Sequence, residues 1–176
     1  MRPYISSFAA CLIVSALLAA CTQRIAPPCP PQNKLIDHAR ITQFRDGPGR
    51  DITDIDFKAV MVDPVGQCVY PDDEERMIIS LQVVFDIERG PTARTQTEDV
   101  PYYVAVVTKD QEIITKQSFV AQLTYPERAS RMRFIDGFVD IEIPLSETLR
   151  PNMIEVKTGF QLTEEQLQYN RASIAR

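Results

Sequence analysis

Residues 77–88 constrain the fold of this chain of 176 residues more than any other stretch. Apolar residues recur there at every second position, and they are Ile79, Leu81, Val83, Phe85 and Ile87. Alternate side chains of a strand point to opposite faces, so this pattern predicts a strand with one buried face. A helix would place Gln82 and Asp86 on the same side as Ile79 and is therefore not expected. Val84 is an apolar exception on the polar face.

Six more stretches have the character of strands. They are residues 39–44, 55–62, 100–108, 113–123, 133–143 and 153–162. Residues 100–108 are apolar on both faces, which predicts a strand in the middle of its sheet. Glycine and proline separate the stretches, and Asp63-Pro64-Val65-Gly66 predicts a turn after residues 55–62.

The alternation in residues 133–143 assigns each side chain to a face. Asp136, Asp140 and Glu142 are expected to point to solvent. The apolar set expected to point inward is Ile135, Val139, Ile141 and Ile143. Gly137 lies inside this strand and is expected to mark a β-bulge, since glycine weakens a regular strand.

The end of the chain predicts one short helix. Thr163 and Gln166 fit a capping box, and the helix would run over residues 164–174. A frayed tail after Tyr169 is the alternative. Seven strands followed by one helix predict an all-β fold, and we favour a seven-strand antiparallel sandwich of the immunoglobulin or fibronectin-III type. The chain has no tryptophan, so the expectation concerns architecture and not membership of the immunoglobulin family.

The start of the chain has the parts of a secretory signal. Arg2 supplies a positive charge, and a mostly apolar run, too short to cross a bilayer, ends in Leu18-Ala19-Ala20-Cys21. These four residues resemble the lipobox of bacterial lipoproteins. The resemblance implies cleavage after Ala20, lipidation of Cys21, and, because Thr22 is not aspartate, an outer membrane location facing the periplasm. An ordinary signal with an incidental cysteine is the alternative.

This resemblance divides the chain into three parts. Residues 1–20 would be the lipoprotein signal peptide, residues 21–34 a lipidated proline-rich tether, and residues 35–176 a single β-sandwich domain. The prolines of the tether favour an extended chain and exclude a helix. The net charge is −5, and loss of Arg2, the only charged residue of the signal, would make it −6. An acidic protein of this kind is a poor candidate for binding nucleic acid.

The same resemblance limits which cysteines remain to pair. Cys11 would leave with the signal and Cys21 would carry lipid, so Cys29 and Cys68 would face an oxidising periplasm. We expect a disulfide between them, which in the chain-entropy model would stabilise the fold by about 4 kcal/mol. Two unpaired, partly buried thiols are the alternative. A zinc site is not expected, since the only histidine is His38.

Few residues suggest catalysis or ligand binding. Asp51, Asp54 and Asp56 lack the spacing of a calcium loop, and the acidic turn at residues 71–75 is expected to be solvated. His38 has no recognisable nucleophile partner and is expected at the surface. The glycines of residues 46–51 do not form a nucleotide-binding fingerprint. We therefore expect no enzyme, no metal and no cofactor.

Two surface features remain open to a binding role. Arg128, Arg131 and Arg133 cluster at one loop and would bind phosphates of lipid or an acidic partner, unless the loop is merely solvated. Val84 together with Tyr102 or Tyr103 would form an apolar partner patch, unless these side chains pack in the core.

Three features resemble small envelope lipoproteins of proteobacteria that have no assigned activity. They are the ending at residues 160–171, the Pro-Pro-Cys-Pro of the tether and Arg89-Gly90-Pro91 after a strand. The expected function is a non-catalytic, membrane-anchored periplasmic module that binds or scaffolds an envelope protein assembly. Its partners would be the membrane, through the lipid, and an envelope protein. The alternative is a carrier or chaperone for a hydrophobic ligand, which predicts a large apolar cavity.

Overall fold

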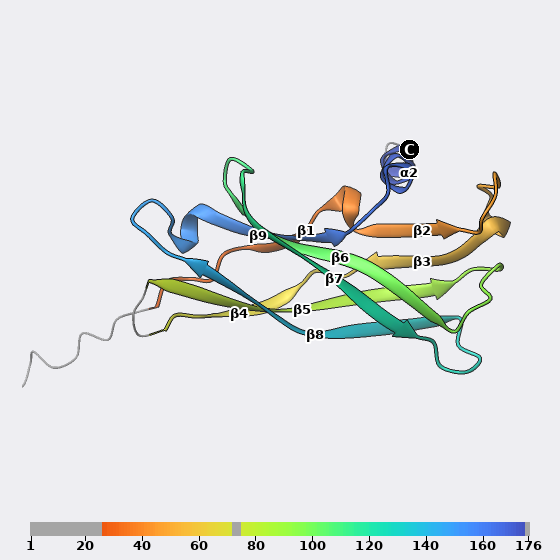
Figure 1. Ribbon diagram of the computed structural model, residues 1–176, viewed down its shortest axis with the longest axis horizontal. Coiled ribbons are helices and arrows are strands. Elements are labelled where there is room, and N and C mark those ends of the chain that lie inside the picture. The colour runs from red at the N-terminus through yellow and green to blue at the C-terminus, as the bar shows by residue number, and fades with distance from the viewer. Residues whose placement is uncertain (1–25, 72–74, 175–176) are drawn as a thin grey trace, which may run out of the picture.

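The computed structural model describes residues 26–71 and 75–174 (Figure 1). Cys21, the lipobox and most of the acidic turn lie outside the described residues. Within the described part, the chain forms two sheets and one short C-terminal helix. The expectation of an all-β fold with a C-terminal helix is confirmed.

Sheet A has four strands, and its order is β1-β9-β6-β7. Their bounds are β1 Gln32–Lys34, β6 Thr97–Thr108, β7 Ile113–Thr124 and β9 Ile154–Phe160. The β1–β9 pair is parallel and the other pairs are antiparallel. Strand β6 lies between β9 and β7, which confirms that residues 100–108 form a central strand.

Sheet B has five strands, and the long strand β5 runs through its middle. Their bounds are β2 Arg40–Phe44, β3 Ile55–Met61, β4 Val65–Val69, β5 Arg76–Arg89 and β8 Arg131–Pro144. Strand β8 pairs with one edge of β5, while β3 and β4 pair with the other edge. Strand β2 continues the sheet beyond β3.

The two sheets share one hydrophobic core. Strand β5 supplies five completely buried side chains to it, and they are Met77, Ile79, Leu81, Val83 and Phe85. Phe85 packs against Tyr102 and Phe160 of sheet A, with ring centroids 5.4 Å and 5.1 Å away. The alternation in residues 77–88 therefore predicted the buried face of this strand correctly.

The described residues contain nine strands, two more than the expected seven. Each expected strand has a counterpart, and the additional strands are the short β1 and β4. Strand β1 lies in residues assigned to the tether, so the folded domain begins earlier than residue 35. Three residues such as Gln32–Lys34 carry too little alternation to predict a strand.

The turn expected at residues 63–66 was wrong. The amide of Val62 donates to the carbonyl of Val84 at 2.9 Å, and β4 then pairs with β5 on the same edge as β3. Pro64 has no N–H and so interrupts the ladder. The chain kinks there but does not reverse, because β5 is long enough to pair with both strands.

Gly137 lies in a β-bulge of β8, as expected. Gln82 pairs with Phe138 and Val84 pairs with Ile135, so Asp136 and Gly137 together lie opposite a single residue of β5. The extra residue reverses the alternation. Ile135 consequently points to solvent and Asp136 points inward, so both predicted orientations were wrong, whereas Val139 and the inward residues after it are buried as expected.

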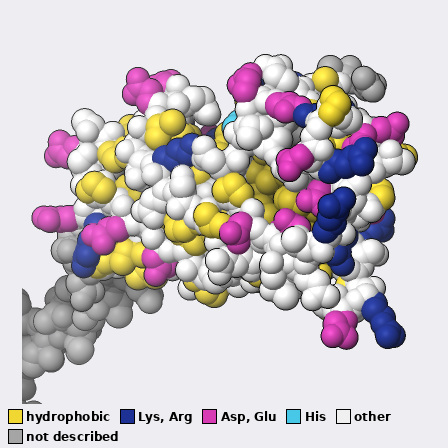
Figure 2. Space-filling view, turned by 45° about the vertical axis from the view of Figure 1, so that its right-hand side comes forward, with side chains coloured by type: hydrophobic (Ala, Val, Ile, Leu, Met, Phe, Trp, Pro, Cys, Tyr) yellow, Lys and Arg dark blue, Asp and Glu magenta, His cyan; other side chains and the backbone are white. Residues whose placement is uncertain are grey.

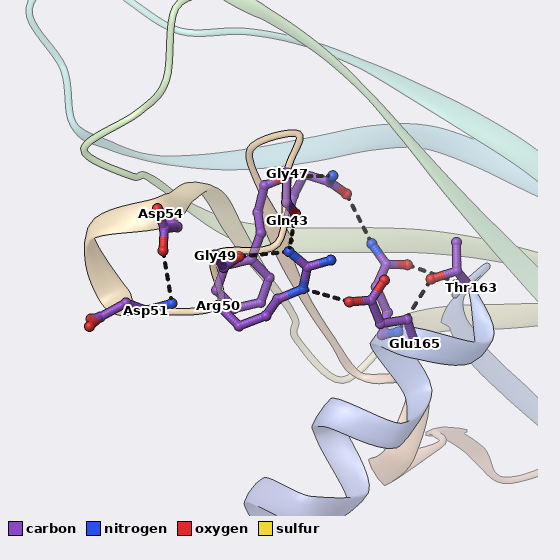
Figure 3. A network of polar contacts seen from close by, with 10 residues as sticks. Gln43, Gly47, Gly49, Arg50, Asp51, Asp54, Thr163 and Glu165 are labelled. Carbon is purple, nitrogen blue, oxygen red and sulfur yellow. Dashed lines mark hydrogen bonds and ion pairs between the residues drawn. The ribbon is translucent and has the colours of Figure 1, made fainter.

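Helix α2 (Glu164–Ile174) ends the described chain and packs beside β2. The Thr163 and Gln166 side chains each bond the other's backbone amide, which confirms the capping box. The helix continues past Tyr169, because the buried Asn170 side chain donates to the carbonyls of Asp37 and Arg40. Arg50 reaches Glu165 from the β2–β3 loop and fastens the first turn (Figure 3).

Short 3₁₀-helices connect several strands, and their bounds are η2 Ile36–His38, η3 Ile52–Asp54 and η4 Pro151–Met153. Among the described residues, no helix is long and apolar enough to cross a membrane.

Candidate functional site

The outer face of sheet B carries a group of exposed or partly exposed apolar side chains. We call it the sheet B patch, and its members are Val60, Val65, Val84, Ile135 and Phe138. Val65 and Phe138 flank Gln82 in the strand register, and Val84 pairs with Ile135. Phe138 is 66% exposed, Val65 68% and Ile135 55%. Several solvent-facing apolar side chains on one face of a sheet make that face a candidate binding surface.

The bulge in β8 is what brings the two largest members together. Ile135 and Phe138 are three positions apart and would lie on opposite faces of a regular strand. Because Asp136 and Gly137 share one position in the register, both apolar side chains reach the outer face. Strand β5 supplies Val84 between them and β3, as an apolar exception in its mostly polar outer face.

Paired charges border the sheet B patch. Arg133 donates two hydrogen bonds of 2.7 Å to Asp86, and Arg131 donates one of 3.1 Å to Glu88. Hydrogen bonding from Arg133 lowers the pKa of Asp86. At the other end, Arg76 donates to Glu142 at 3.1 Å and the Ser80 hydroxyl donates to Asp140. An apolar centre with a satisfied polar rim is the usual anatomy of a protein–protein interface.

Two of the three clustered arginines already have carboxylate partners within the protein. Arg131 and Arg133 lie on β8 and are paired with carboxylates of β5. Arg128 lies apart from them in the β7–β8 loop, in the left-handed backbone region with φ 64°. The sequence showed the three arginines close together, but it did not show that β5 places a carboxylate opposite two of them.

Tyr102 and Tyr103 do not join Val84. Tyr102 is in the core, where its hydroxyl donates to Oδ2 of the inward-pointing Asp136 at 2.8 Å. Burial and this contact raise the pKa of Tyr102. Tyr103 belongs to a separate apolar cluster on the outer face of sheet A. The sequence thus identified Val84 as a patch residue but missed Ile135 and Phe138, since the bulge that exposes them shifts the alternation.

The aspartates near residue 54 have a structural role. Asp54 is buried, contacts Arg45 at 2.5 Å and forms a capping box with Asp51 at the start of η3. The Arg50 guanidinium donates to the carbonyls of Gly47 and Gly49, so this loop is organised around an arginine (Figure 3). Within residues 26–71 and 75–174, no three acidic, histidine or cysteine side chains gather as a metal site would require.

His38 is half-buried, with its Nδ1 atom 3.3 Å from the carbonyl of Phe160. A carbonyl only accepts, so Nδ1 carries the proton in this contact. The ring also lies edge-on to Tyr103, with centroids 5.7 Å apart. His38 therefore holds η2 against sheet A.

Cys29 and Cys68 lie at disulfide distance, with Cα atoms 5.5 Å apart. Cys68 is in β4 of sheet B, and Cys29 precedes β1 of sheet A. Tyr70 adds a contact at the same place, because its hydroxyl donates to the carbonyl of Pro28 at 3.3 Å. The pair therefore joins the tether to both sheets at one end of the molecule.

Comparisons of the chain with protein-family models, with curated proteins and with solved structures give no match. The geometry of the chain itself must therefore carry the functional argument.

Proposed function

We propose that this chain is a lipid-anchored, non-catalytic module that binds or scaffolds an envelope protein at the periplasmic side of the outer membrane. The sheet B patch is the observation that carries the proposal. Its apolar members supply area that loses water on binding, and the paired charges around it give orientation. Rigid strands hold these side chains in place, which suits recognition of a folded partner.

The lipobox and the tether supply the anchor of this proposal. Cys29 lies eight positions after Cys21. A proline-rich segment of that length extends about 25 Å at roughly 3.1 Å per residue. The end of the domain that carries Cys29 and Cys68 would therefore stay near the membrane, and a partner of the sheet B patch would be found in that zone.

The anchor has a direct test. Replacement of Cys21 by alanine should abolish incorporation of labelled palmitate and release the protein from membranes. A Cys11→Ala variant is the matched control, because Cys11 would leave with the signal. Labelling that persists in the Cys21→Ala variant would contradict the anchor.

The binding role is tested separately by crosslinking in cells. A Phe138→Glu variant should lose its crosslinked protein partner, because a buried carboxylate without a counter-charge is costly at an interface. An Ile36→Glu variant is the control, since Ile36 is an exposed apolar residue of η2, which contacts β9 of sheet A. Equal recovery of the partner with both variants would show that the sheet B patch is not the interface.

The carrier alternative receives no support from the interior of the protein. It requires a large apolar cavity, whereas the side chains that face each other across the two sheets are fully buried and in contact. They include Leu81, Val83, Phe85, Val104, Val106 and Phe160. The geometry of the described residues therefore favours a binding module that uses its surface.

A further inference from the structure

The outer face of sheet A is hollowed at its centre. In Figure 2, hydrophobic side chains line a recess next to the cyan histidine. The hollow has a volume of about 230 Å³, and its apolar lining includes Leu35, Tyr103, Ala105, Val107, Ile113 and Leu162. We call it the sheet A hollow.

Small residues in the middle of the sheet create this hollow. Ala105 of β6 lies in register between Lys116 of β7 and Lys157 of β9, so two long side chains flank a single methyl group. The next row pairs Tyr103 with Gly159. A Cβ atom at Gly159 would lie 2.7 Å from the Tyr103 hydroxyl oxygen, so the missing side chain leaves room for the tyrosine.

The floor of the hollow is apolar and ordered by packing. Tyr103, Ala105 and Val107 are each about 5% exposed or less and form a cluster separate from the main core, with Leu35 packed against it. Burial raises the pKa of Tyr103 to about 12, so this floor stays uncharged at neutral pH. The floor therefore suits an apolar group and offers no negative charge to repel an anion.

The rim of the hollow is cationic although the whole chain is acidic. Lys116 and Lys157 are among its lining residues, and none of the lining residues is an aspartate or a glutamate. Lys157 pairs with Glu155 of the same strand. The Lys116 ammonium lies 4.3 Å from the centre of the Tyr103 ring and has no carboxylate partner among the described residues. Lys116 is thus the cation available to a ligand.

We propose that the sheet A hollow binds a compact amphipathic carboxylate, with an apolar body over Ala105 and a carboxylate paired with Lys116. The volume restricts the body to one ring or one branched alkyl group, because sites for drug-sized ligands occupy roughly 300–1,000 Å³. Two kinds of ligand carry this combination of an apolar body and a carboxylate. One is a free carboxylic acid, and the other is the C-terminal residue of a protein, which combines an apolar side chain with a carboxylate.

The inference does not depend on the sheet B patch or on the anchor, because it uses the opposite face of the sandwich. Its failure would leave the proposed partner interface untouched. Conversely, loss of the crosslinked partner in the Phe138→Glu variant would say nothing about the sheet A hollow.

The test is an NMR titration of the full chain in detergent micelles with hydrocinnamate, using empty micelles with ligand as the reference. The methyl signals of Ala105 and Val107 should shift and saturate. A dissociation constant on the order of 1 mM is expected, given the small number of ligand atoms. No saturable shift at these methyls up to about 10 mM would overturn the proposal.

Two variants and one ligand analogue locate the contacts. Ala105→Leu fills the hollow and should weaken binding more than about tenfold. Lys116→Gln should weaken it about fivefold, as for an exposed ion pair, whereas Lys58→Gln on the outer face of sheet B should leave it unchanged. Equal affinity of Lys116→Gln and Lys58→Gln, or equal binding of the uncharged hydrocinnamyl alcohol, would overturn the proposed carboxylate contact.

An additional titration with a short peptide distinguishes the two kinds of ligand. A short peptide ending in phenylalanine with a free carboxylate should bind more tightly than hydrocinnamate if the natural ligand is a protein C-terminus. The reverse order indicates a free acid. Binding of the same peptide with an amidated end at equal strength would contradict the carboxylate contact for either kind of ligand.

Discussion

The two outer faces of this sandwich are built from similar strands, yet they offer different surfaces. On sheet B, Ile135 and Phe138 project from a bulged strand and carboxylates neutralise the neighbouring arginines. On sheet A, the small Ala105 lies between two lysines and leaves a recess. The chemistry of an outer face thus depends on the size of its central side chains and on whether the charged side chains beside them are paired.

A substitution in the core should cost far more stability than one on either outer face. Phe85→Ala should lower the free energy of unfolding by about 3–5 kcal/mol, because it removes a fully buried ring that contacts both sheets. Denaturant unfolding followed by circular dichroism measures this loss. Phe138→Ala is the matched control and should change stability by less than about 0.5 kcal/mol. Similar losses for the two variants would show that Phe138 is a core residue and not part of a binding surface.

A second prediction concerns the link that holds the two sheets together near the tether. Replacing Cys29 and Cys68 by serine should lower the free energy of unfolding by about 2–4 kcal/mol, since 39 positions separate the pair. Thermal unfolding of the native chain with and without reductant gives an independent measure of how much the disulfide stabilises the fold. An unchanged melting temperature on reduction would argue that the cysteines are unpaired thiols, and the tether would then be free of sheet B.

A third prediction tests the bulge that shapes the sheet B patch. Tyr102→Phe removes the donor to the inward-pointing Asp136 and should lower the free energy of unfolding by about 1–2 kcal/mol. Tyr70→Phe, which removes an exposed hydrogen bond to Pro28, should cost less than about 0.5 kcal/mol. Equal effects would mean that Tyr102 does not hold Asp136 inside, and the orientation of Ile135 and Phe138 would need another cause.

The sequence predicted the parts of this fold that depend on a regular period. Strand β5 and the central strand β6 follow directly from their apolar positions, and Thr163 with Gln166 predicted the helix start. Departures from the period were harder to predict. Gly137 indicated a bulge, but the resulting change of face for Ile135 was missed. A turn was predicted around Pro64, because proline lacks the N–H that a ladder requires. The missing N–H does not reveal that the chain resumes pairing with the same strand as β4.

The candidate surfaces were less accessible to sequence reasoning than the fold. Val84 was recognisable as an apolar residue on a polar face, but its neighbours come from β8, and their register is set by pairing over long range. The sheet A hollow depends on Ala105 lying between Lys116 and Lys157, which belong to three different strands. Such a juxtaposition has no local signature along the chain.

The smallest expected effect concerns the charged rim of the sheet B patch. Arg133 lowers the pKa of Asp86 in the folded protein. The pair therefore stabilises the fold at pH values above the pKa that Asp86 has in the unfolded chain. This stabilisation is lost as the pH falls through the lower pKa that Asp86 has in the folded protein. In an Arg133→Gln variant, the pKa of Asp86 should rise towards its ordinary value, as measured by an NMR titration of its carboxyl carbon. Arg131→Gln should leave it unchanged, because Arg131 pairs with Glu88. An unmoved pKa of Asp86 in the Arg133→Gln variant would contradict this pairing.

Site-specific photo-crosslinking in living cells tests the central proposal, a partner interface on sheet B, most directly. A photoreactive amino acid would replace Val65, Ile135 or Phe138 of the sheet B patch, and Ser118 on the outer face of sheet A would serve as the reference position. Binding through sheet B predicts one discrete protein adduct at the three patch positions and none at Ser118. No discrete adduct at the patch positions, or the same adduct at all four positions, would contradict it.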